Sequence, residues 1–442
     1  MTDTARTLGP GAGASATGRG LKRRRRRRWV RGGAVGVCVL LVAAAGAGWA
    51  VYAKLDGNIT PDNAAAAELA RYEKERPTAL VKNAQNILLI GSDSRSGDGN
   101  ARYGRDSGTE RSDTTILLHL AAGRRSATAV SLPRDLMVDV PGCRRPDGSR
   151  TEPMFAMFNS AFQTGGSACT IRTVEKLTGV RVDHHVVVDF HGFKDMVDAV
   201  DGVRICLAEP IHDKAAKLKL PAGKVTLDGE QALGYVRARK SIGDGSDTDR
   251  MDRQQQFLAA LVNKVRSNDV LLNPVKLYPV LDAATSSLTT DPDLANLRGL
   301  YDLVRGLRDI PTERVQFLTV PRESYTYDTN RDQLVEAEAE KLFEQLRRDA
   351  PVVVAEEVPE DSATKSPNSS DGSQEEADIS DESHEDGSYD GHDEYYGDYE
   401  SYDDYDGYYD GKSGAKRPDE PVAAVTPAPT FRGNTAAEDT CK

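Results

Sequence analysis

Two kinds of apolar pattern alternate between residues 84 and 350. Buried strands of an α/β sheet are continuous apolar runs, whereas helices repeat apolar residues every three or four positions. Runs of the first kind are Asn86–Ile90, Thr114–Leu120, Ala127–Leu132, Met137–Val140, His184–Phe190, Val203–Leu207 and Val315–Val320. Stretches of the second kind are Phe155–Phe162, Thr170–Leu177, Phe193–Val200, Asp228–Val236, Arg250–Val265, Pro274–Asp282, Leu294–Leu307 and Arg331–Arg348. This alternation predicts an α/β sandwich over residues 84–350.

A longer apolar stretch lies near the N-terminus. Val30–Val51 is almost wholly apolar, has Trp29 and Trp49 near its ends, and follows the arginine run Arg23–Arg28. About twenty apolar residues span a bilayer, tryptophan favours its interfaces, and clustered basic residues stay on the cytoplasmic side. The pattern predicts a cytoplasmic tail over residues 1–28, a single transmembrane helix over 29–52 and an extracellular domain beyond it.

The same apolar stretch also has features of a cleaved signal peptide, which is the alternative to a permanent anchor. Small residues suitable for cleavage are available at Ala43–Ala47. Nucleic-acid binding by the arginine run is not expected, because the run abuts the apolar span and serves as a topology signal. Residues 53–83 follow as a predicted juxtamembrane stalk, helical around Ala64–Ala70 and ended by Pro77.

The C-terminal part, residues 351–442, differs in composition from the rest. Pro351–Asp410 holds 21 acidic residues against one basic residue, so the remainder of this net −12 chain sums to +8. Ser388–Gly411 is a repeat of Asp, Gly and Tyr. Low aliphatic content and like-charge repulsion predict a disordered acidic tail. It would be a solvated spacer, or alternatively a segment that binds divalent cations or a cationic or glycan partner.

Charged residues stand at one end of each of the first three apolar runs. They are Asp93 and Arg95 after the first run, Arg111 and Asp113 before the second, and Arg134 and Asp135 after the third. Strands that are apolar along their length and charged at their ends place a polar site at the rim of a sheet. Carboxylates with several arginines suit a divalent cation and a phosphorylated ligand. The alternative is an ordinary cluster of surface ion pairs.

More cationic and amide side chains occur farther along the chain. Arg237 and Arg239 alternate in YVRAR, and they would point the same way if that segment is extended. Arg250 and Gln254 are four residues apart on a predicted helix and share a face. Collecting these donors in one place is costly unless an anion neutralises them, and a pyrophosphate is a natural candidate.

The motifs carrying these residues resemble the LytR-CpsA-Psr family of bacterial cell-wall proteins. They are GSDSR, RSDT, SLPRD, LTGV, VDFHGF, LPAG, QAL, YVRAR and DRMDRQQQ, in order from Gly91 to Gln256. The resemblance implies a three-layer α/β/α sandwich with a mixed central sheet. It also implies transfer of a glycopolymer phosphate from a polyprenyl-pyrophosphate-linked glycan to peptidoglycan, on the outer face of the membrane.

The resemblance also implies roles for individual residues. Asp93 and Asp113 would hold Mg²⁺, and the pyrophosphate would be held by Arg111, Arg134, Arg237, Arg239, Arg250 and Gln254. The sequence does not settle the base: Asp113 and Asp135 are both candidates, and a loose transition state would need little help from a base. The polyprenyl chain would lie in an apolar tunnel, for which the candidate lining residues are Val186, Val188, Phe193, Phe257 and Leu261, although these five could equally be solid core. Two alternatives stay open: a polyprenyl-pyrophosphate glycan hydrolase, and a non-catalytic regulatory binding protein.

Five cysteines complete the set of reactive residues. Cys38 lies in the predicted span, and Cys143 and Cys169 flank the same helical segment of the extracellular domain, where oxidising conditions permit a disulfide. We expect these two to pair. Cys206 lies in an apolar run and is expected to be a buried thiol, and Cys441 has no evident partner. No C-x-x-C spacing suggests a zinc site.

Overall fold

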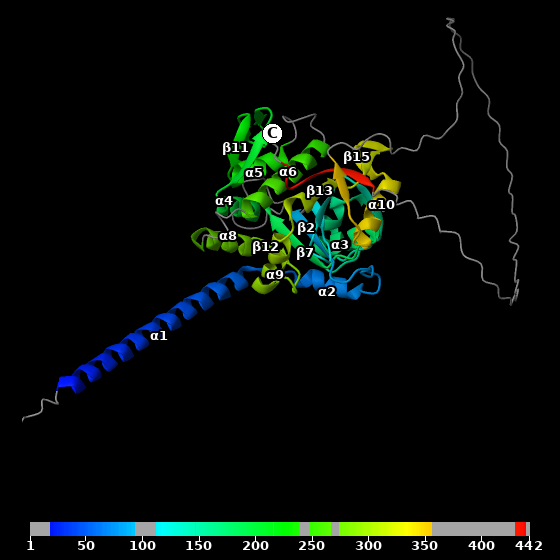
Figure 1. The fold of residues 1–442 in the computed structure, drawn as a ribbon. Coiled ribbons are helices and arrows are strands. Elements are labelled where there is room, and N and C mark those ends of the chain that lie inside the picture. The colour runs from blue at the N-terminus through cyan, green and yellow to red at the C-terminus, as the bar shows by residue number, and fades with distance from the viewer. Residues whose placement is uncertain are drawn as a thin grey trace, which may run out of the picture. The chain divides into compact units, whose positions relative to one another are not determined.

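A nine-stranded mixed sheet organises the computed structural model, which describes residues 18–92, 112–145, 147–214, 216–238, 247–266, 274–355 and 429–438 (Figure 1). In spatial order the strands are β1 (Thr60–Pro61), β12 (Leu288–Thr290), β7 (His184–Asp189), β2 (Gln85–Ser92), β3 (Ser112–Leu120), β4 (Ala127–Leu132), β13 (Val315–Thr319), β17 (Thr430–Thr435) and β16 (Val353–Ala355). β7, β2, β4 and β13 run in one direction, and β3 runs against them. Four strands therefore end where β3 begins, at what we call the Asp113 edge.

Helices cover both faces of this sheet, as the three-layer prediction requires. On one face lie α2 (Asn63–Arg71), α3 (Asn159–Thr178) and α10 (Glu336–Arg347), and on the other lie α6 (Asp247–Arg266) and α9 (Leu297–Arg308). The alternation along β2 decides which core each residue joins. Leu88 and Ile90 pack under α3, whereas Ile87 and Leu89 pack toward α6 and α9.

A smaller lobe with its own apolar core adjoins the sheet. It contains α4 (Phe190–Ala199), α5 (Gly229–Arg237), α8 (Pro274–Ser286) and the strands β8 (Val203–Leu207), β9 (Ile211–Asp213), β10 (Leu218–Leu220) and β11 (Gly223–Leu227). Two hairpins complete the described strands: β5 (Met137–Val140) with β6 (Met154–Met157), and β14 (Arg322–Tyr325) with β15 (Asp328–Leu334). Phe193, Phe257 and Leu261 belong to this lobe, whereas Val186 and Val188 pack beneath α9. The five residues suggested for one tunnel thus lie in two separate cores.

The N-terminal helix α1 (Gly18–Asn58) joins the domain without a separate stalk. Leu55 in its last turn and Ile59 just after its end are buried, at 3% and 5% exposed, and β1 then pairs with β12. α2 follows and packs against α3. The structure therefore differs from the stalk predicted over residues 53–83, because apolar residues of that segment face partners that are distant in the sequence.

The C-terminal part also differs from the tail predicted over residues 351–442. β16 and β17 both belong to the central sheet, and β17 lies between β13 and β16. Phe431 is 5% exposed and Ala436 is fully buried. Residues at both ends of the predicted tail therefore contribute to the fold, and the Asp-Gly-Tyr repeat lies outside the described residues.

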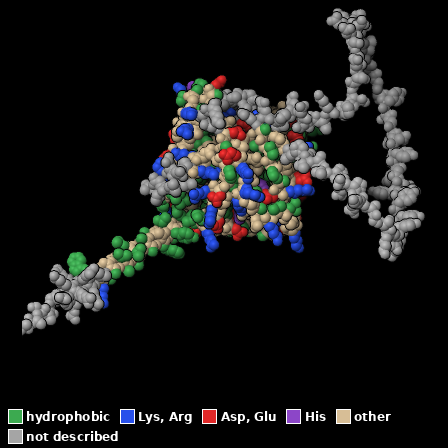
Figure 2. Space-filling model, viewed as in Figure 1, with side chains coloured by type: hydrophobic (Ala, Val, Ile, Leu, Met, Phe, Trp, Pro, Cys, Tyr) green, Lys and Arg blue, Asp and Glu red, His purple; other side chains and the backbone are tan. Residues whose placement is uncertain are grey.

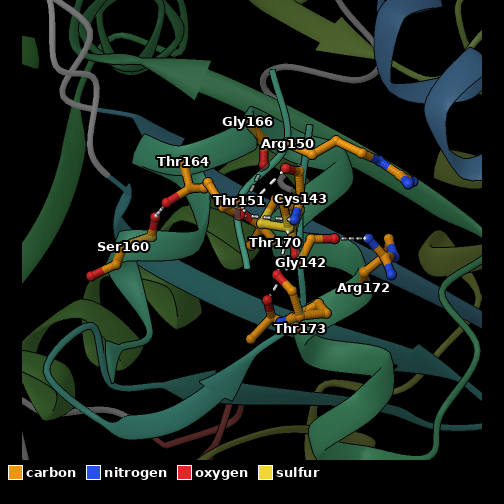
Figure 3. The surroundings of a disulfide bond; sticks show 12 residues. Gly142, Cys143, Arg150, Thr151, Ser160, Thr164, Gly166, Thr170, Arg172 and Thr173 are labelled. Atoms are coloured by element: carbon orange, nitrogen blue, oxygen red, sulfur yellow. Dashed lines mark hydrogen bonds between the residues drawn. A yellow bond between two sulfur atoms is a disulfide. The ribbon is translucent and has the colours of Figure 1, made fainter. Parts of the chain in front are cut away.

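The predicted disulfide is present between Cys143 and Cys169 (Figure 3). It joins the loop after β5 to α3, and Arg172 supports that loop with a 2.6 Å hydrogen bond from Nη1 to the Gly142 carbonyl. Cys206 is also disulfide-bonded, which contradicts the expectation of a buried thiol. Its partner lies outside the described residues.

Candidate functional site

Arg134 joins two of the predicted site carboxylates at the Asp113 edge. Its Nη1 lies 2.8 Å from Asp113 Oδ1, and its Nε lies 3.2 Å from Asp135 Oδ2. Asp113 is the second residue of β3, and Arg134 and Asp135 follow the end of β4. The three side chains remain partly exposed, between 18% and 28%. The antiparallel pairing of β3 with β4 is what brings together residues that are 21 positions apart.

Arg331 is a fourth member of this cluster that the sequence prediction missed. Its Nη1 lies 3.7 Å from the second oxygen of Asp135, and its Nε lies 3.4 Å from Asp328. Arg331 was expected to begin the closing helix, but it lies in β15, and α10 starts only at Glu336. A hydrogen bond of 3.2 Å from the Asp332 amide to the Asp135 carbonyl holds β15 beside the loop after β4. The cluster thus has two carboxylates and two guanidinium groups.

The first half of α6 is attached to the same edge. Gln255 Nε2 donates to Thr319 Oγ1 at 2.9 Å, which fixes α6 to the end of β13. Gln254 Nε2 donates to the Val236 carbonyl at 3.1 Å and so links α6 to the last turn of α5. Arg250 lies one turn before Gln254 and is 5% exposed. Arg250 and Gln254 lie four residues apart on one helix, as predicted, but the side-chain amide of Gln254 donates to a backbone carbonyl.

Arg237 approaches the edge from the end of α5. It is the last residue of that helix, so the YVRAR segment is helical through Arg237 and not extended as considered from the sequence. Its guanidinium carbon lies 4.5 Å from the centre of the Phe190 ring, which directly follows β7. An arginine stacked on an aromatic ring keeps its donors pointing outward in a fixed plane. Arg237 therefore presents exposed donors beside the ends of β7 and β2.

Three of the predicted site residues, Asp93, Arg111 and Arg239, lie outside the described residues, and so does the insert Ser96–Glu110. The chain positions next to two of them are described. Ser92 ends β2 and is paired with Ser112, which begins β3. The described strands therefore lead into and out of this insert at the Asp113 edge.

A pocket of about 1000 Å³ with mixed polar and apolar lining opens beside Ser92 on the α3 face of the sheet. Residues of both charges line it, among them Asp62, Arg71, Arg144, Arg145 and Asp189, together with Gly165–Ala168. At Gly165 and Gly166 the helix α3 is broken, and its second half starts at the pocket wall. A pocket of mixed charge with hydroxyl and amide groups suits a polar, zwitterionic or glycan ligand.

The opposite face of the same strands is apolar and incompletely covered. The partly buried apolar side chains here come from β2, β3, β7, α6, β12 and α9, and are Leu89, Leu118, Val188, Leu258, Val262, Leu288, Leu300, Leu303 and Leu307. The sheet thus has a pocket with charged lining on one face and an apolar surface on the other.

A match to a family model decides the relationship of the chain. Residues 56–348, more than half of the sequence, match the LytR_cpsA_psr family. The chain belongs to this family. The match begins within the last turns of α1, in agreement with a folded domain that includes the segment expected to be a stalk.

Two curated relatives within the family carry functional names. The chain is 37% identical over 283 residues to "Probable cell wall biosynthesis protein LcpB" of Corynebacterium glutamicum, covering 61% of this chain and 63% of the relative. It is 28% identical to "Polyisoprenyl-teichoic acid--peptidoglycan teichoic acid transferase TagT" of Bacillus subtilis, covering 71% of this chain and 93% of that protein. The match therefore spans less than two thirds of the Corynebacterium relative.

A solved structure supports the fold of the family domain. Protein gbs0355 from Streptococcus agalactiae superposes with a TM-score of 0.51 at 20% identity, over 60% of this chain and 88% of that one. Identity at this level shows the fold alone.

The donor set at the edge is compatible with a magnesium ion that is bound partly through substrate. Mg²⁺ is held in phosphate-binding sites by one or two carboxylates together with phosphate oxygens and water. Asp113 uses one oxygen for Arg134, which leaves Oδ2 for such a role. Within the described ranges no three His, Cys, Asp or Glu side chains gather as a metal cage. Asp113 therefore fits a site in which substrate oxygens share the ion.

Proposed function

We propose that this protein is a membrane-anchored extracellular transferase that moves a glycopolymer phosphate from a polyprenyl pyrophosphate carrier to peptidoglycan. The observation that carries the proposal is the Arg134 cluster, defined as Asp113, Arg134, Asp135 and Arg331. It lies at the edge of a sheet that has a pocket with charged lining on one face and an apolar surface on the other. A lipid-linked glycan has three parts that match these features: an apolar chain for the apolar surface, an anionic pyrophosphate for the arginines and a polar sugar for the pocket. The name of the Bacillus relative, a polyisoprenyl-teichoic acid–peptidoglycan transferase, supports the same chemistry.

The pyrophosphate is proposed to bind at the Asp113 edge. Arg134 and Arg331 lie within salt-bridge distance of Asp113 or Asp135, and Arg237 offers exposed donors nearby. Arginine binds phosphate oxygens through two parallel hydrogen bonds, so an incoming phosphate competes with the carboxylates for these donors. Arg111, Arg239 and Arg250 are proposed to complete the set, as the family resemblance implies.

The polyprenyl chain is proposed to lie on the apolar surface beneath α9. Leu300, Leu303 and Leu307 of α9 point toward the sheet but stay partly exposed, and no residue of α9 is fully buried. Covering this surface with isoprene units would remove apolar area from water, worth about 25 cal/mol per Å². The glycan and the peptidoglycan acceptor would then meet on the α3 face of the sheet, where the pocket opens.

The reaction is a phosphoryl transfer in which the protein positions groups and neutralises charge. A peptidoglycan hydroxyl oxygen forms a bond to the sugar-proximal phosphorus, and the bond from that phosphorus to the bridging oxygen breaks. The electron pair leaves with polyprenyl phosphate, whose charge Arg134 and Arg331 stabilise. Asp113 or Asp135 takes the hydroxyl proton. Mg²⁺, held by Asp113 and, as the family resemblance implies, Asp93, would supply further charge neutralisation at the phosphate oxygens.

The product of a defined reaction tests this proposal. The full chain in detergent is given a polyprenyl-pyrophosphate-linked oligosaccharide, with and without soluble peptidoglycan oligomers. A transferase forms an acceptor that carries glycan through one phosphate, and it releases polyprenyl phosphate only when the acceptor is present. Equal release without acceptor would identify a hydrolase, and binding without any product would identify a non-catalytic protein.

A further inference from the structure

The end of α1 is fixed to the domain within one turn of its last exposed aromatic residues. Trp49 and Tyr52 are 71% and 42% exposed and stack with ring centres 6.0 Å apart, whereas Leu55 is 3% exposed. At 1.5 Å per residue, Trp49 and Leu55 are separated by only about 9 Å along the helix. Trp and Tyr favour the membrane interface, whose headgroup layer is about 5–8 Å thick on each side. The surface onto which Leu55 packs must therefore lie close to the headgroups.

Polar contacts make this attachment rigid. Lys54 Nζ lies 2.9 Å from Asp282 of α8, and Asn58 Nδ2 donates to the same carboxylate at 2.9 Å. Asp56 accepts a 2.8 Å hydrogen bond from the amide of Leu297, the first residue of α9. The start of α9 is thus bonded directly to the last turns of α1, and α8 and α9 lie beside its base (Figure 1).

The outer side of α9 has the composition of a helix that lies in a membrane interface. Tyr301 and Val304 are 61% and 53% exposed, although the apolar side chains of the other face point to the sheet. Arg298, Arg305 and Arg308 are exposed on the same stripe, three, four or seven residues from Tyr301. Asp302 is the exposed acidic residue of α9, and Asp309 follows its end. Within the described ranges no ion pair engages these three arginines.

We propose that α9 lies in the headgroup layer of the bilayer that α1 spans, with its three arginines bound to anionic lipid phosphates. Tyr301 and Val304 would enter the interface between headgroups and acyl chains, as the apolar residues of interfacial helices do. A lipid bilayer is the expected partner of this face, because α9 is hydrogen-bonded at its start to the last turn of α1, the apolar helix that Figure 2 shows extending from the domain. Each arginine held near an anionic surface adds to the attraction.

Depth-dependent quenching of a fluorophore tests the contact. The full chain with Cys38→Ser and Val304→Cys is labelled with an environment-sensitive dye and reconstituted in vesicles of equal parts phosphatidylglycerol and phosphatidylcholine. The matched control carries the dye at Tyr327→Cys, 87% exposed in the β14–β15 hairpin, on the side of the domain away from α9. Spin-labelled headgroups are expected to quench the dye at position 304 several-fold more than at 327. Equal quenching at both positions would overturn the proposal.

A variant without the three arginine charges distinguishes lipid binding to the outer side of α9 from burial of that side by another protein molecule. Replacing Arg298, Arg305 and Arg308 by Gln should reduce quenching at position 304 in the anionic vesicles, with an unchanged melting temperature. In pure phosphatidylcholine the wild type should resemble this variant. Quenching at position 304 that stays the same in the Gln variant and in pure phosphatidylcholine would contradict lipid binding. Quenching that falls as more protein is reconstituted per vesicle would also contradict it, and would point to a second copy of the chain covering this face.

Discussion

Arg134 and Asp113 form an ion pair across the start of β3 and the end of β4, with 2.8 Å between Nη1 and Oδ1. Arg134 holds Asp135 at the same time, so one guanidinium group links two carboxylates. Without a phosphate these partners satisfy one another. A bound phosphate would take over the arginine donors and leave the carboxylates for a cation or a proton.

The C-terminal strand is expected to stabilise the domain. Ending the chain after Ala355 removes β17, together with the buried Phe431 and Ala436. Loss of a buried phenylalanine costs about 3–5 kcal/mol, so the melting temperature should fall clearly. Deleting only residues 361–424, which keeps β17, is the matched control and should melt like the wild type. Equal melting of both variants would show that β17 does not contribute to stability.

Cys206 is expected to pair with Cys441. Cys206 is disulfide-bonded, Cys143 is paired with Cys169, and Cys38 is free, which leaves one cysteine of the five. The C-terminal segment is also near, because Asn263 of α6 donates to the Ala436 carbonyl at 2.7 Å and α6 packs against β8. Peptide mapping without reduction should recover the linked pair. A free thiol at Cys441 would contradict this assignment.

His184 should make stability depend on pH. A hydrogen bond with Asp291, 3.1 Å from Nδ1 to Oδ1, raises the pKa of His184 above its ordinary value of 6.5, although burial opposes the shift. The protonated form is therefore favoured in the folded state. This contribution is fully present below pH 6.5 and is lost as the pH rises through the raised pKa.

The comparison of His184→Gln with the wild type isolates this contribution. The difference in melting temperature should be larger at about pH 5.5 than at about pH 9. Asp291 stays ionised at the lower pH because, although burial opposes the shift, its bond with His184 lowers the pKa of its carboxyl. A difference that is constant or grows with pH would contradict the ion-pair assignment.

Replacing Arg237 by Lys should reduce turnover without unfolding the protein. Lysine keeps the charge but loses both the planar fork and the stacking on Phe190. Losing a charge-assisted bidentate contact costs about 1.5–3 kcal/mol, which is a roughly ten- to hundredfold fall in kcat/KM. Arg204→Lys, an exposed arginine on β8, is the control and should retain activity. Wild-type kinetics in the Arg237 variant would remove this residue from the site.

The strands of the sheet could be predicted because their apolar runs are local. The three runs that contain Leu88, Leu117 and Val130 correspond to β2, β3 and β4. The described charged ends of the second and third runs meet as expected, whereas that of the first lies outside the described residues. The sequence did not predict that Arg331 belongs to the site, because the helical pattern predicted from Arg331 onward includes residues of a strand. Arg331 lies in β15, which pairs with β14 in a hairpin, and α10 begins only at Glu336.

The predicted limits of the domain, residues 84 and 350, are too narrow for a different physical reason. Leu55 and Phe431 are buried only because residues far away in the sequence pack on them. A short strand such as β17 has no periodicity that distinguishes it from a loop, particularly after an acidic repeat. Its pairing with β13 and β16 depends on contacts that no local pattern encodes.

Turnover and stability of Arg134→Lys, measured on the same preparation, test the central claim that the Arg134 cluster binds the transferred phosphate. We expect transfer to peptidoglycan to fall roughly ten- to hundredfold, because the bidentate grip is lost while the charge is kept. The melting temperature should change little, since this partly exposed ion pair contributes little to folding. Asp113→Asn, measured in parallel, should lose activity together with its dependence on Mg²⁺. Wild-type turnover in Arg134→Lys, or a loss of activity only in step with unfolding, would contradict the claim.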